Sequence, residues 1–285
     1  MKILVLGASG HIGSLIYEYY KSTYSDVAGT YFQNNNNDLI KFDLSEDSEL
    51  SNLLNQGIDL IIWAIGFKDI LKTENFEGNT YKVNIVLLNL FLKRLQKLRI
   101  KPKLIYISTD YVFDGEKGKY YSNDMPNPKT NYGLSKYLSE LMLLNQYNNS
   151  KIVRTSAIMS VKSSFINWFK NECINKKKIK LYTDSTFTPT PASFFLKWLD
   201  HLIQKNFPEK IFHISSNFDF TRFQFGELIL KNNLLEFDNE IKLVKIKSEE
   251  GLNFMKGNLS LKSSKFINPI EKEEFIQLLK MDIKG

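Results

Sequence analysis

The stretch TNYGLSKYLSE, residues 130–140, places Tyr132 four positions before Lys136. Residues four apart lie on one face of a helix, so the phenol and the ammonium are expected side by side. A phenol has an ordinary pKa of about 10, and a neighbouring cation stabilises the phenolate and lowers that value. Such a pair could donate or accept a proton, whereas the alternative is a polar edge that simply faces water.

The same stretch predicts an amphipathic helix. Tyr132, Lys136 and Glu140 share one edge, and apolar residues at helical spacing fall on roughly the opposite side: Leu134, Leu138, Leu141 and Met142. We therefore expect the leucines to face the core and the Tyr–Lys edge to be open.

A glycine-rich turn, GASGHIG, follows the first predicted strand and opens a helix. Its three glycines stand where a tight turn, close approach of the backbone to a pyrophosphate and close helix packing exclude a side chain. Free N–H groups and the positive end of the helix dipole would hold the phosphates. The turn predicts a dinucleotide site with cofactor contacts from Gly7, Ser9, Gly10, His11, Ile12 and Gly13, in which His11 is not a catalyst.

Three later positions bear on the cofactor. The second predicted strand ends near residues 31–33 without the carboxylate that would bind the ribose of NAD. This favours NADPH over NADH, although no arginine is there to bind a 2′-phosphate. Asp43 either holds the adenine amino group, beside Leu44, or caps the helix that follows. Further contacts are expected after the fourth strand, from Ala64, Ile65 and Gly66.

Short apolar runs alternate with helical patterns through the first half of the chain. Runs such as residues 60–65 and 104–107 suit strands buried on both faces, as in a parallel sheet covered by helices. The predicted fold class is α/β, a Rossmann-type doubly wound parallel sheet with a smaller C-terminal lobe. We expect an NAD(P)-binding domain at residues 1–155 and a substrate-binding lobe at 156–285, which includes the strands in KIFHIS and IKLVKIK. The chain can cross between them.

Composition excludes several classes of protein. The 285 residues are 43% hydrophobic and carry a net charge of +7. The basic residues are scattered rather than gathered in a stripe with aromatic residues, so nucleic-acid binding is not expected. Cys173 is the single cysteine, and His11, His201 and His213 have no ligand spacing, so neither a disulfide nor a metal site is expected. Without a signal-peptide pattern or an apolar run of about 20 residues, we expect no membrane span and a soluble, cytoplasmic protein.

Two further stretches narrow the function. STDYVFDG, residues 108–115, precedes NYGLSKYLSE, with GKYYSNDMPNP between them. With Gly-x-x-Gly-x-x-Gly at the start and Tyr-x-x-x-Lys on a later helix, the chain resembles the extended short-chain dehydrogenase/reductase family. Within it, the chain is similar to the dTDP-4-dehydrorhamnose reductase (RmlD-like) branch, which reduces the 4-keto group of nucleotide-linked 6-deoxyhexoses. The similarity is closer in the first half than in the second, where TFTPTPASF carries it.

The resemblance implies a role for each of several residues. Tyr132 would give a proton to the ketone oxygen of the sugar, and Lys136 would bind the nicotinamide ribose and lower the pKa of the phenol. Thr109 would hydrogen-bond the same oxygen. Asn84 would have a structural or cofactor-side role, and Ser108 would contact the cofactor or only satisfy the backbone. Substrate contacts are expected from Tyr111, Val112, Phe113 and Ala157.

Positions at which this chain differs from related enzymes narrow the type of reaction it can catalyse. Nucleotide-sugar 4,6-dehydratases place an Asp–Glu pair after the threonine, whereas this chain has Asp110 and Tyr111. The GDP-fucose synthase type uses a cysteine in this loop, and Cys173 lies elsewhere. The rhamnose-pathway enzymes commonly have tryptophan where this chain has Ala157, which changes the sugar pocket. An amino- or deoxyhexose nucleotide is therefore an equally suitable substrate.

These observations predict an oxidoreductase that uses NADPH or NADH and acts on a nucleotide sugar in surface-polysaccharide biosynthesis. It could form a homodimer, as helix pairs on such sheets often do. Two alternatives stay open: a non-catalytic NADP-binding regulatory subunit, like the partner of methionine adenosyltransferase in the same branch, and a nucleotide-sugar epimerase of the superfamily.

Overall fold

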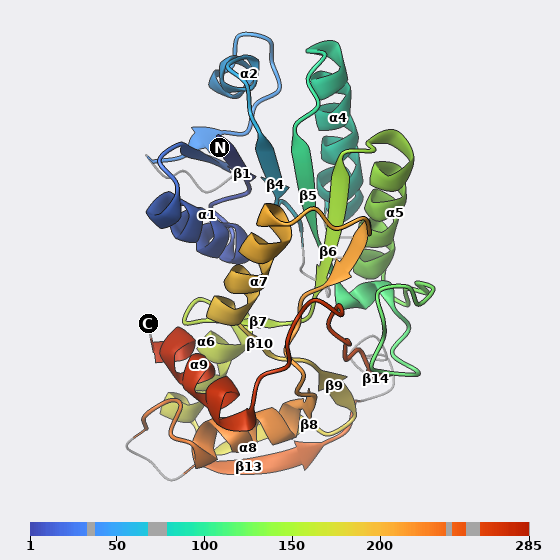
Figure 1. Cartoon of the computed structure of the whole chain (residues 1–285). Coiled ribbons are helices and arrows are strands. Elements are labelled where there is room, and N and C mark those ends of the chain that lie inside the picture. Colours follow the sequence, from blue (N-terminus) through green and yellow to red (C-terminus); the bar gives the residue numbers. More distant parts are fainter. Residues whose placement is uncertain (33–37, 68–78, 238–240, 249–256, 285) are drawn as a thin grey trace. The chain divides into compact units, whose positions relative to one another are not determined.

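The computed structural model describes residues 1–32, 38–67, 79–237, 241–248 and 257–284. The chain forms two compact units (Figure 1). The first comprises Met1–Val112, Pro128–Arg154 and Pro208–Phe212, and the second comprises Phe113–Asn127, Thr155–Phe207 and His213–Gly285. The chain therefore passes from one unit to the other more than once.

The first unit is built on a seven-stranded sheet with the strand order β11-β6-β5-β4-β1-β2-β3. In chain order its strands are β1 (Ile3–Leu6), β2 (Val27–Tyr31), β3 (Ile40–Lys41), β4 (Leu60–Trp63), β5 (Lys103–Thr109), β6 (Ser150–Thr155) and β11 (Ile211–His213). Strands β3, β2, β1, β4 and β5 pair in parallel. The order reverses direction beside β1, as in a doubly wound nucleotide-binding sheet. The predicted fold class is confirmed.

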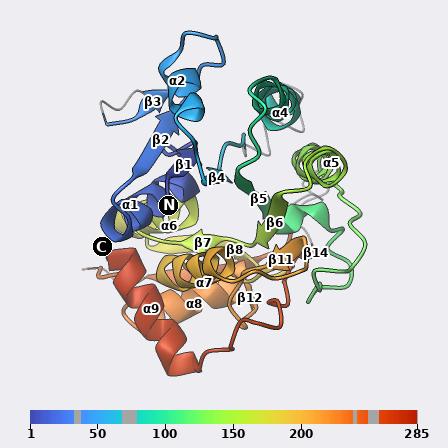
Figure 2. The same ribbon diagram turned by 45° about the horizontal axis from the view of Figure 1, so that its top comes forward.

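Helices cover both faces of this sheet. They are α1 (His11–Thr23), α2 (Glu49–Asn55), the π-helical turn η1 (Lys82–Val86) that continues into α4 (Leu87–Lys97), the 3-10 turn η2 (Asp110–Val112) and α5 (Asn131–Gln146). Figure 2 shows α4 and α5 side by side on one face and α1 on the other. Alternate strand residues face the α2, α4 and α5 layer and form its core, among them Leu4, Leu6, Ile61, Trp63, Leu104 and Tyr106.

The second unit mixes short strands with four helices of the described chain. Its elements are β7 (Ile158–Met159), α6 (Ser164–Asn175), β8 (Lys178–Tyr182), β9 (Ser185–Phe187), β10 (Thr190–Pro191), α7 (Ala192–Gln204), β12 (Phe220–Thr221), α8 (Arg222–Lys231), β13 (Lys242–Ile246), β14 (Gly257–Asn258) and α9 (Lys272–Lys284). Aromatic side chains fill its core, including Phe169, Phe187, Phe225 and Phe275. Of the helices that the structure describes in either unit, none has the length and apolar character needed to span a bilayer.

The segment KIFHIS corrects one expectation. The sequence predicts it as a strand of the C-terminal lobe, but β11 is the edge strand of the large sheet, next to β6. The backbone N–H of Ile152 donates to the carbonyl of Lys210, 2.8 Å away, just before β11 begins. The strand pattern was correct, but the neighbour of an edge strand depends on tertiary pairing rather than on local sequence.

Candidate active site

Helix α5, which carries Tyr132 and Lys136, packs its polar face against the sheet. Lys136 and Glu140 are only 3% and 1% exposed. Three leucines of the same helix are between 36% and 39% exposed: Leu134, Leu138 and Leu141. The prediction that the leucines face the core and the Tyr–Lys edge is open is therefore wrong. Met142, the fourth predicted residue of the leucine stripe, is partly buried against the core.

Hydrogen bonds explain why the polar face can be buried. The hydroxyl of Ser139 donates to the carbonyl of Asn84 at 2.8 Å, and the side-chain amide of Asn84 donates to the Ser135 hydroxyl at 2.8 Å. Glu140 and Lys136 also have partners on the strands. Burying a polar group is costly unless it is hydrogen-bonded, and on this face of α5 the partners are supplied by β5, β6 and η1.

The start of α5 is fixed against η2. The Thr130 hydroxyl caps the helix by accepting from the backbone N–H of Gly133 at 2.9 Å. A Cβ added to Gly133 would stand 2.0 Å from the carbonyl oxygen of Tyr111. Because only glycine permits this approach, the first turn of α5, with Tyr132, packs directly on the segment that follows Thr109.

The ammonium group of Lys136 is buried. It donates to the carbonyl of Ile107 at 2.7 Å and lies 4.0 Å from the centroid of the Tyr106 ring. A Cβ on Gly66 would stand 3.8 Å from the ammonium nitrogen, so the loop after β4 passes close by. Burial lowers the pKa of Lys136 to about 7, and the negative charge of Glu140 opposes this decrease.

Thr109 lies close enough to Tyr132 for its hydroxyl to act to lower the pKa of the phenol. Burial has the larger effect, and together with the charge of Asp110 it raises the pKa of Tyr132 well above its ordinary value. The decrease implied by the resemblance is therefore not found, because burial outweighs the favourable contacts. A phenol in this state keeps its proton at neutral pH, as a proton donor must.

Thr109 lies at the last position of β5 and is 8% exposed. Its hydroxyl donates to the carboxylate of Asp110 at 3.0 Å and accepts from the backbone N–H of Tyr111 at 3.3 Å. The structure thus brings together the three residues predicted to be catalytic: Tyr132 lies beside Thr109, and Lys136 bonds to the carbonyl of Ile107, two residues before Thr109.

The glycine turn has the geometry of a phosphate-binding loop. Gly7 has a φ of +87°, and the backbone N–H of Gly10 donates to its carbonyl at 3.0 Å. A Cβ on Gly13 would stand 2.0 Å from the same oxygen. Gly10 is the N-cap of α1, and no side chain caps that helix terminus. Because no side chain caps it, the first turn of α1 can donate its N–H groups to an anion. Ser9, His11 and Ile12 are partly exposed beside them.

The loop after β4 is fixed from two sides. The indole N–H of Trp63 donates to the carbonyl of Ile65 at 3.1 Å, and Ala64 and Gly66 flank this buried residue. The side-chain oxygen of Asn84 accepts from the backbone N–H of Phe67 at 2.8 Å. Asn84 is fully buried and links this loop to α5, which supports the structural rather than the cofactor-side alternative for that residue.

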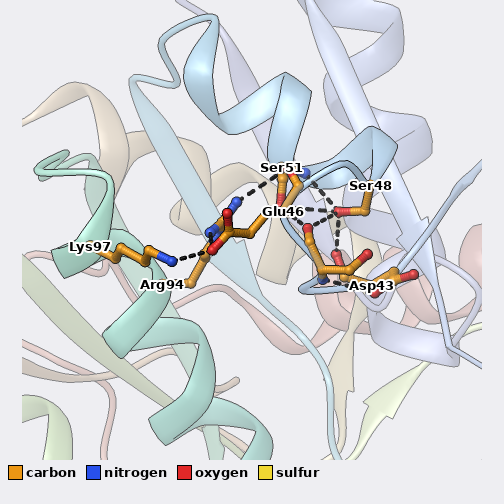
Figure 3. A network of polar contacts seen from close by, with 7 residues as sticks. Asp43, Glu46, Ser48, Ser51, Arg94 and Lys97 are labelled. Carbon is orange, nitrogen blue, oxygen red and sulfur yellow. Dashed lines mark hydrogen bonds and ion pairs between the residues drawn. The ribbon is translucent and has the colours of Figure 1, made fainter.

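Figure 3 shows the segment around Asp43. The Asp43 carboxylate accepts from the backbone N–H of Ser45 at 2.9 Å, which lowers its pKa. Ser48, not Asp43, caps α2 by accepting from the backbone N–H of Ser51, so the helix-cap alternative for Asp43 is wrong. On α4, Arg94 and Lys97 bind Glu46 and hold this segment in place. Leu44 is partly exposed beside Asp43.

The predicted substrate contacts differ in accessibility. Tyr111 is partly exposed, and its ring centroid lies 5.7 Å from that of Tyr132. Val112 and Phe113 are buried, and Phe113 stacks on Tyr120, so burial favours a packing role for these two side chains. Ala157 is partly buried against the core of the second unit. In the described parts of the chain no cluster of side chains could hold a metal ion.

Sequence comparison decides the family. The RmlD substrate binding domain family matches residues 1–251. The chain belongs to this family. It is therefore a member of the dTDP-4-dehydrorhamnose reductase branch of the extended short-chain dehydrogenase/reductases, as the motifs predict.

Curated relatives of this RmlD-family chain include proteins of glycan synthesis. The spore coat polysaccharide biosynthesis protein SpsK of Bacillus subtilis is 27% identical over 240 residues, which cover 82% of this chain and 80% of that one. The dTDP-4-dehydrorhamnose reductase of Aggregatibacter actinomycetemcomitans is 29% identical over 162 residues, 54% of this chain and 51% of that one. Methionine adenosyltransferase 2 subunit beta of Danio rerio is 27% identical over 156 residues, 54% and 46% of the two chains.

Solved structures share the fold of this RmlD-family chain. A hypothetical dTDP-4-dehydrorhamnose reductase from Sulfolobus tokodaii superposes with a TM-score of 0.76 at 26% identity, covering 92% of both chains. The dTDP-4-dehydrorhamnose reductase of Bacillus anthracis in complex with NADP superposes with a TM-score of 0.81 at 19% identity, covering 99% of this chain and 98% of that one.

Proposed function

We propose that this protein is an NAD(P)H-dependent reductase of the 4-keto group of a nucleotide-diphosphate 6-deoxyhexose in nucleotide-sugar or surface-polysaccharide biosynthesis. The observation that carries the proposal is the meeting of Thr109, Tyr132 and Lys136 on one face of the first unit. The names of the relatives in spore-coat polysaccharide synthesis and rhamnose synthesis support the same substrate class.

The glycine turn fits a dinucleotide. The positions where a Cβ would collide, Gly7 and Gly13, leave backbone N–H groups at the start of α1 open to a pyrophosphate. Lys136 would bind the nicotinamide ribose, and Asp43 would receive the adenine amino group. Tyr31 and Phe32, the described residues at the end of β2, carry no carboxylate to bind a ribose 2′-hydroxyl, which supports NADPH over NADH.

In the proposed reaction, the ketone carbon would receive a hydride from a nicotinamide held by the glycine turn and Lys136. Tyr132 donates its phenolic proton to the ketone oxygen, so that no alkoxide is left without a proton. Thr109 would turn its hydroxyl from Asp110 to the ketone, donate a hydrogen bond to the same oxygen and orient it. The positive charge of Lys136, one helical turn after Tyr132, stabilises the phenolate that remains.

Replacing Tyr132 by phenylalanine tests this proposal. Turnover of NADPH with a panel of 4-keto sugar nucleotides should fall about 10²–10⁴-fold, the usual contribution of a positioned acid, while NADPH affinity stays the same. Tyr137→Phe, which removes a hydroxyl from the same helix, is the matched control and should retain full turnover. Turnover that survives in Tyr132→Phe would overturn the assignment of the proton donor.

The same assay separates the alternatives. A regulatory subunit would bind NADPH tightly but would not oxidise it with any of the keto-sugar nucleotides. An epimerase would interconvert sugar nucleotides with catalytic cofactor, without net consumption of NADPH. The presence of threonine, tyrosine and lysine together at the end of β5 supports a catalytic role.

The division of labour between the units is also a proposal. Residues 1–155 would bind the cofactor and residues 156–285 the sugar, with Ala157 in place of an aromatic platform. Tyr111, beside Tyr132, would contact the sugar. The single cysteine, Cys173, is buried and free, which suits a protein that acts in the cytoplasm.

We also propose a homodimer formed through α5 and α4. The exposed positions of α5 carry no charge: its two charged residues, Lys136 and Glu140, are buried, whereas its leucines face outward. Val86 and Leu90, on the neighbouring η1 and α4, are 46% and 45% exposed. Depletion of charge around exposed apolar side chains is typical of an interface core. A second copy would cover this face by packing the same two helices against it.

A further inference from the structure

Lys136 is a buried cation whose two closest partners are both uncharged. The ammonium bonds to the Ile107 carbonyl at 2.7 Å and lies 4.0 Å from the centroid of the Tyr106 ring. Its side chain is 3% exposed. An ammonium that has lost its water is stable only where other groups favour its charge, and the face of an aromatic ring does so.

One turn further along α5, Glu140 forms an ion pair that is fully removed from water. Arg154 on β6 donates from Nε at 3.0 Å to Oε1 and from its terminal nitrogen at 2.7 Å to Oε2. Both side chains are 1% exposed. The Ser108 hydroxyl donates to the same carboxylate. Such a bidentate pair fixes the geometry of the carboxylate as well as its charge.

The two side chains of α5 therefore hold consecutive residues at the end of β5. Lys136 binds the Ile107 carbonyl and Glu140 binds the Ser108 hydroxyl, immediately before Thr109. The link between Tyr132 and Thr109 depends on how α5 lies along this strand end. A group that holds α5 there positions the catalytic residues without touching the substrate.

We propose that Tyr106, Glu140 and Arg154 are positioning residues: Tyr106 and Glu140 keep the Lys136 ammonium charged, and Arg154 holds Glu140 in place at the end of β5. The role of these residues in catalysis rests on the proposed function, whereas their effect on the charge of Lys136 does not. Among the described residues, Tyr106 on β5 and Glu140 on α5 act directly on Lys136. Arg154 on β6 binds Glu140, and Asp110 on η2 acts on Tyr132, one helical turn before Lys136.

The charges in this arrangement predict that substitutions of Glu140 and of Arg154 shift the pKa of Lys136 in opposite directions. Glu140→Gln removes the nearby negative charge and leaves Arg154, so the pKa of Lys136 should fall. Arg154→Met leaves the carboxylate with Lys136 as its remaining cation, so the pKa should rise. Arg154→Lys keeps the charge and should restore the original value. A role confined to stability would give the same sign for both changes.

Substitutions of Tyr106 give a second comparison, in which the Glu140–Arg154 ion pair stays intact. Tyr106→Phe keeps the aromatic face and should leave the titration of Lys136 unchanged. Tyr106→Leu removes it, and the pKa of Lys136 should fall by about one unit, a tenfold loss of proton affinity. Because breaking a buried ion pair can prevent folding, this pair decides the question if the Glu140 or Arg154 variants do not fold.

The experiment is a pH titration of protein labelled with ¹³C at the lysine ε-carbon, followed by NMR, with the Lys136 signal assigned from its loss in Lys136→Met. Opposite shifts in Glu140→Gln and Arg154→Met, together with the Tyr106 result, support the proposal. Identical Lys136 titrations in Tyr106→Leu and Tyr106→Phe would overturn it. The titration needs no substrate. It can therefore succeed even if Tyr132→Phe retains turnover and the proposed function fails, and it can fail while that function stands.

Discussion

Gly133 and Tyr111 are in backbone contact: a Cβ at position 133 would stand 2.0 Å from the Tyr111 carbonyl oxygen. Gly133 follows Tyr132, and Tyr111 follows the pair Thr109 and Asp110. The missing side chain therefore sets the distance between the phenol and the strand end that carries Thr109.

Gly133→Ala should separate these groups. Relief of the clash must move backbone, because a carbonyl cannot rotate away as a flexible side chain can, and overpacking of this kind costs about 1–3 kcal/mol. We expect turnover to fall at least tenfold and the free energy of unfolding to decrease. The measurements are turnover and urea denaturation, with Asn145→Ala, at an exposed position of the same helix, as the control. Unchanged turnover would show that this contact does not set the site.

Gly13→Ala should act on the cofactor instead. Its Cβ would meet the Gly7 carbonyl oxygen at 2.0 Å and displace the start of α1 from the turn. Since the phosphates would bind the N–H groups at this helix start, the dissociation constant of NADPH should rise at least tenfold. Fluorescence titration with NADPH measures it. Ser22→Ala, near the far end of α1, should bind NADPH as the unaltered chain does.

The pH dependence of activity should reflect Lys136. Its pKa of about 7 means that the charged form is lost as the pH rises through neutrality. The value of kcat/KM, which reports groups of the free enzyme, should therefore decrease on the alkaline side of about pH 7. An activity that stays constant from pH 6 to 9 would contradict a catalytic need for the Lys136 charge.

Stability should change with pH in the opposite direction. Between about pH 7 and the ordinary lysine pKa near 10.4, the unfolded chain holds a proton on Lys136 that the folded chain has released. Because the unfolded state then binds more protons, the free energy of unfolding rises with pH across this range. The destabilisation caused by Lys136 is therefore smallest at high pH. Lys136→Met should remove this contribution, and denaturation of both proteins across this range measures the difference.

The leucine face of α5 predicts a change in mass. If a second copy covers Leu134 and Leu138, replacing both with lysine should convert a dimer into a monomer in analytical ultracentrifugation. The free energy of unfolding of the monomer should change little, because both side chains are exposed within one chain. Met281→Lys, at an exposed apolar residue of α9, should leave the dimer intact. An unaltered chain that sediments as a monomer at high concentration would contradict this interface.

The sequence by itself determined the features whose signals are local. A glycine turn between an apolar run and a helix permits few backbone paths, so GASGHIG predicted both the turn and its place beside β1. Apolar runs without alternation predicted strands covered on both faces. The spacing of Tyr132 and Lys136 placed them one turn apart whatever the rest of the chain does, because helix geometry alone fixes that relation.

The tertiary structure decided which face of α5 is buried. Hydrophobic periodicity pointed to the leucines, but the polar face finds its partners on β5, β6 and η1, and those partners lie far away in the sequence. Two features of the sequence point to this arrangement: Glu140 continues the Tyr132 and Lys136 spacing, and Arg154 is a charged residue within the apolar run of β6. Each indicates a buried charge that needs a partner. Pairing between distant charges, like the neighbour of an edge strand, depends on the assembled sheet, so local patterns could not show it.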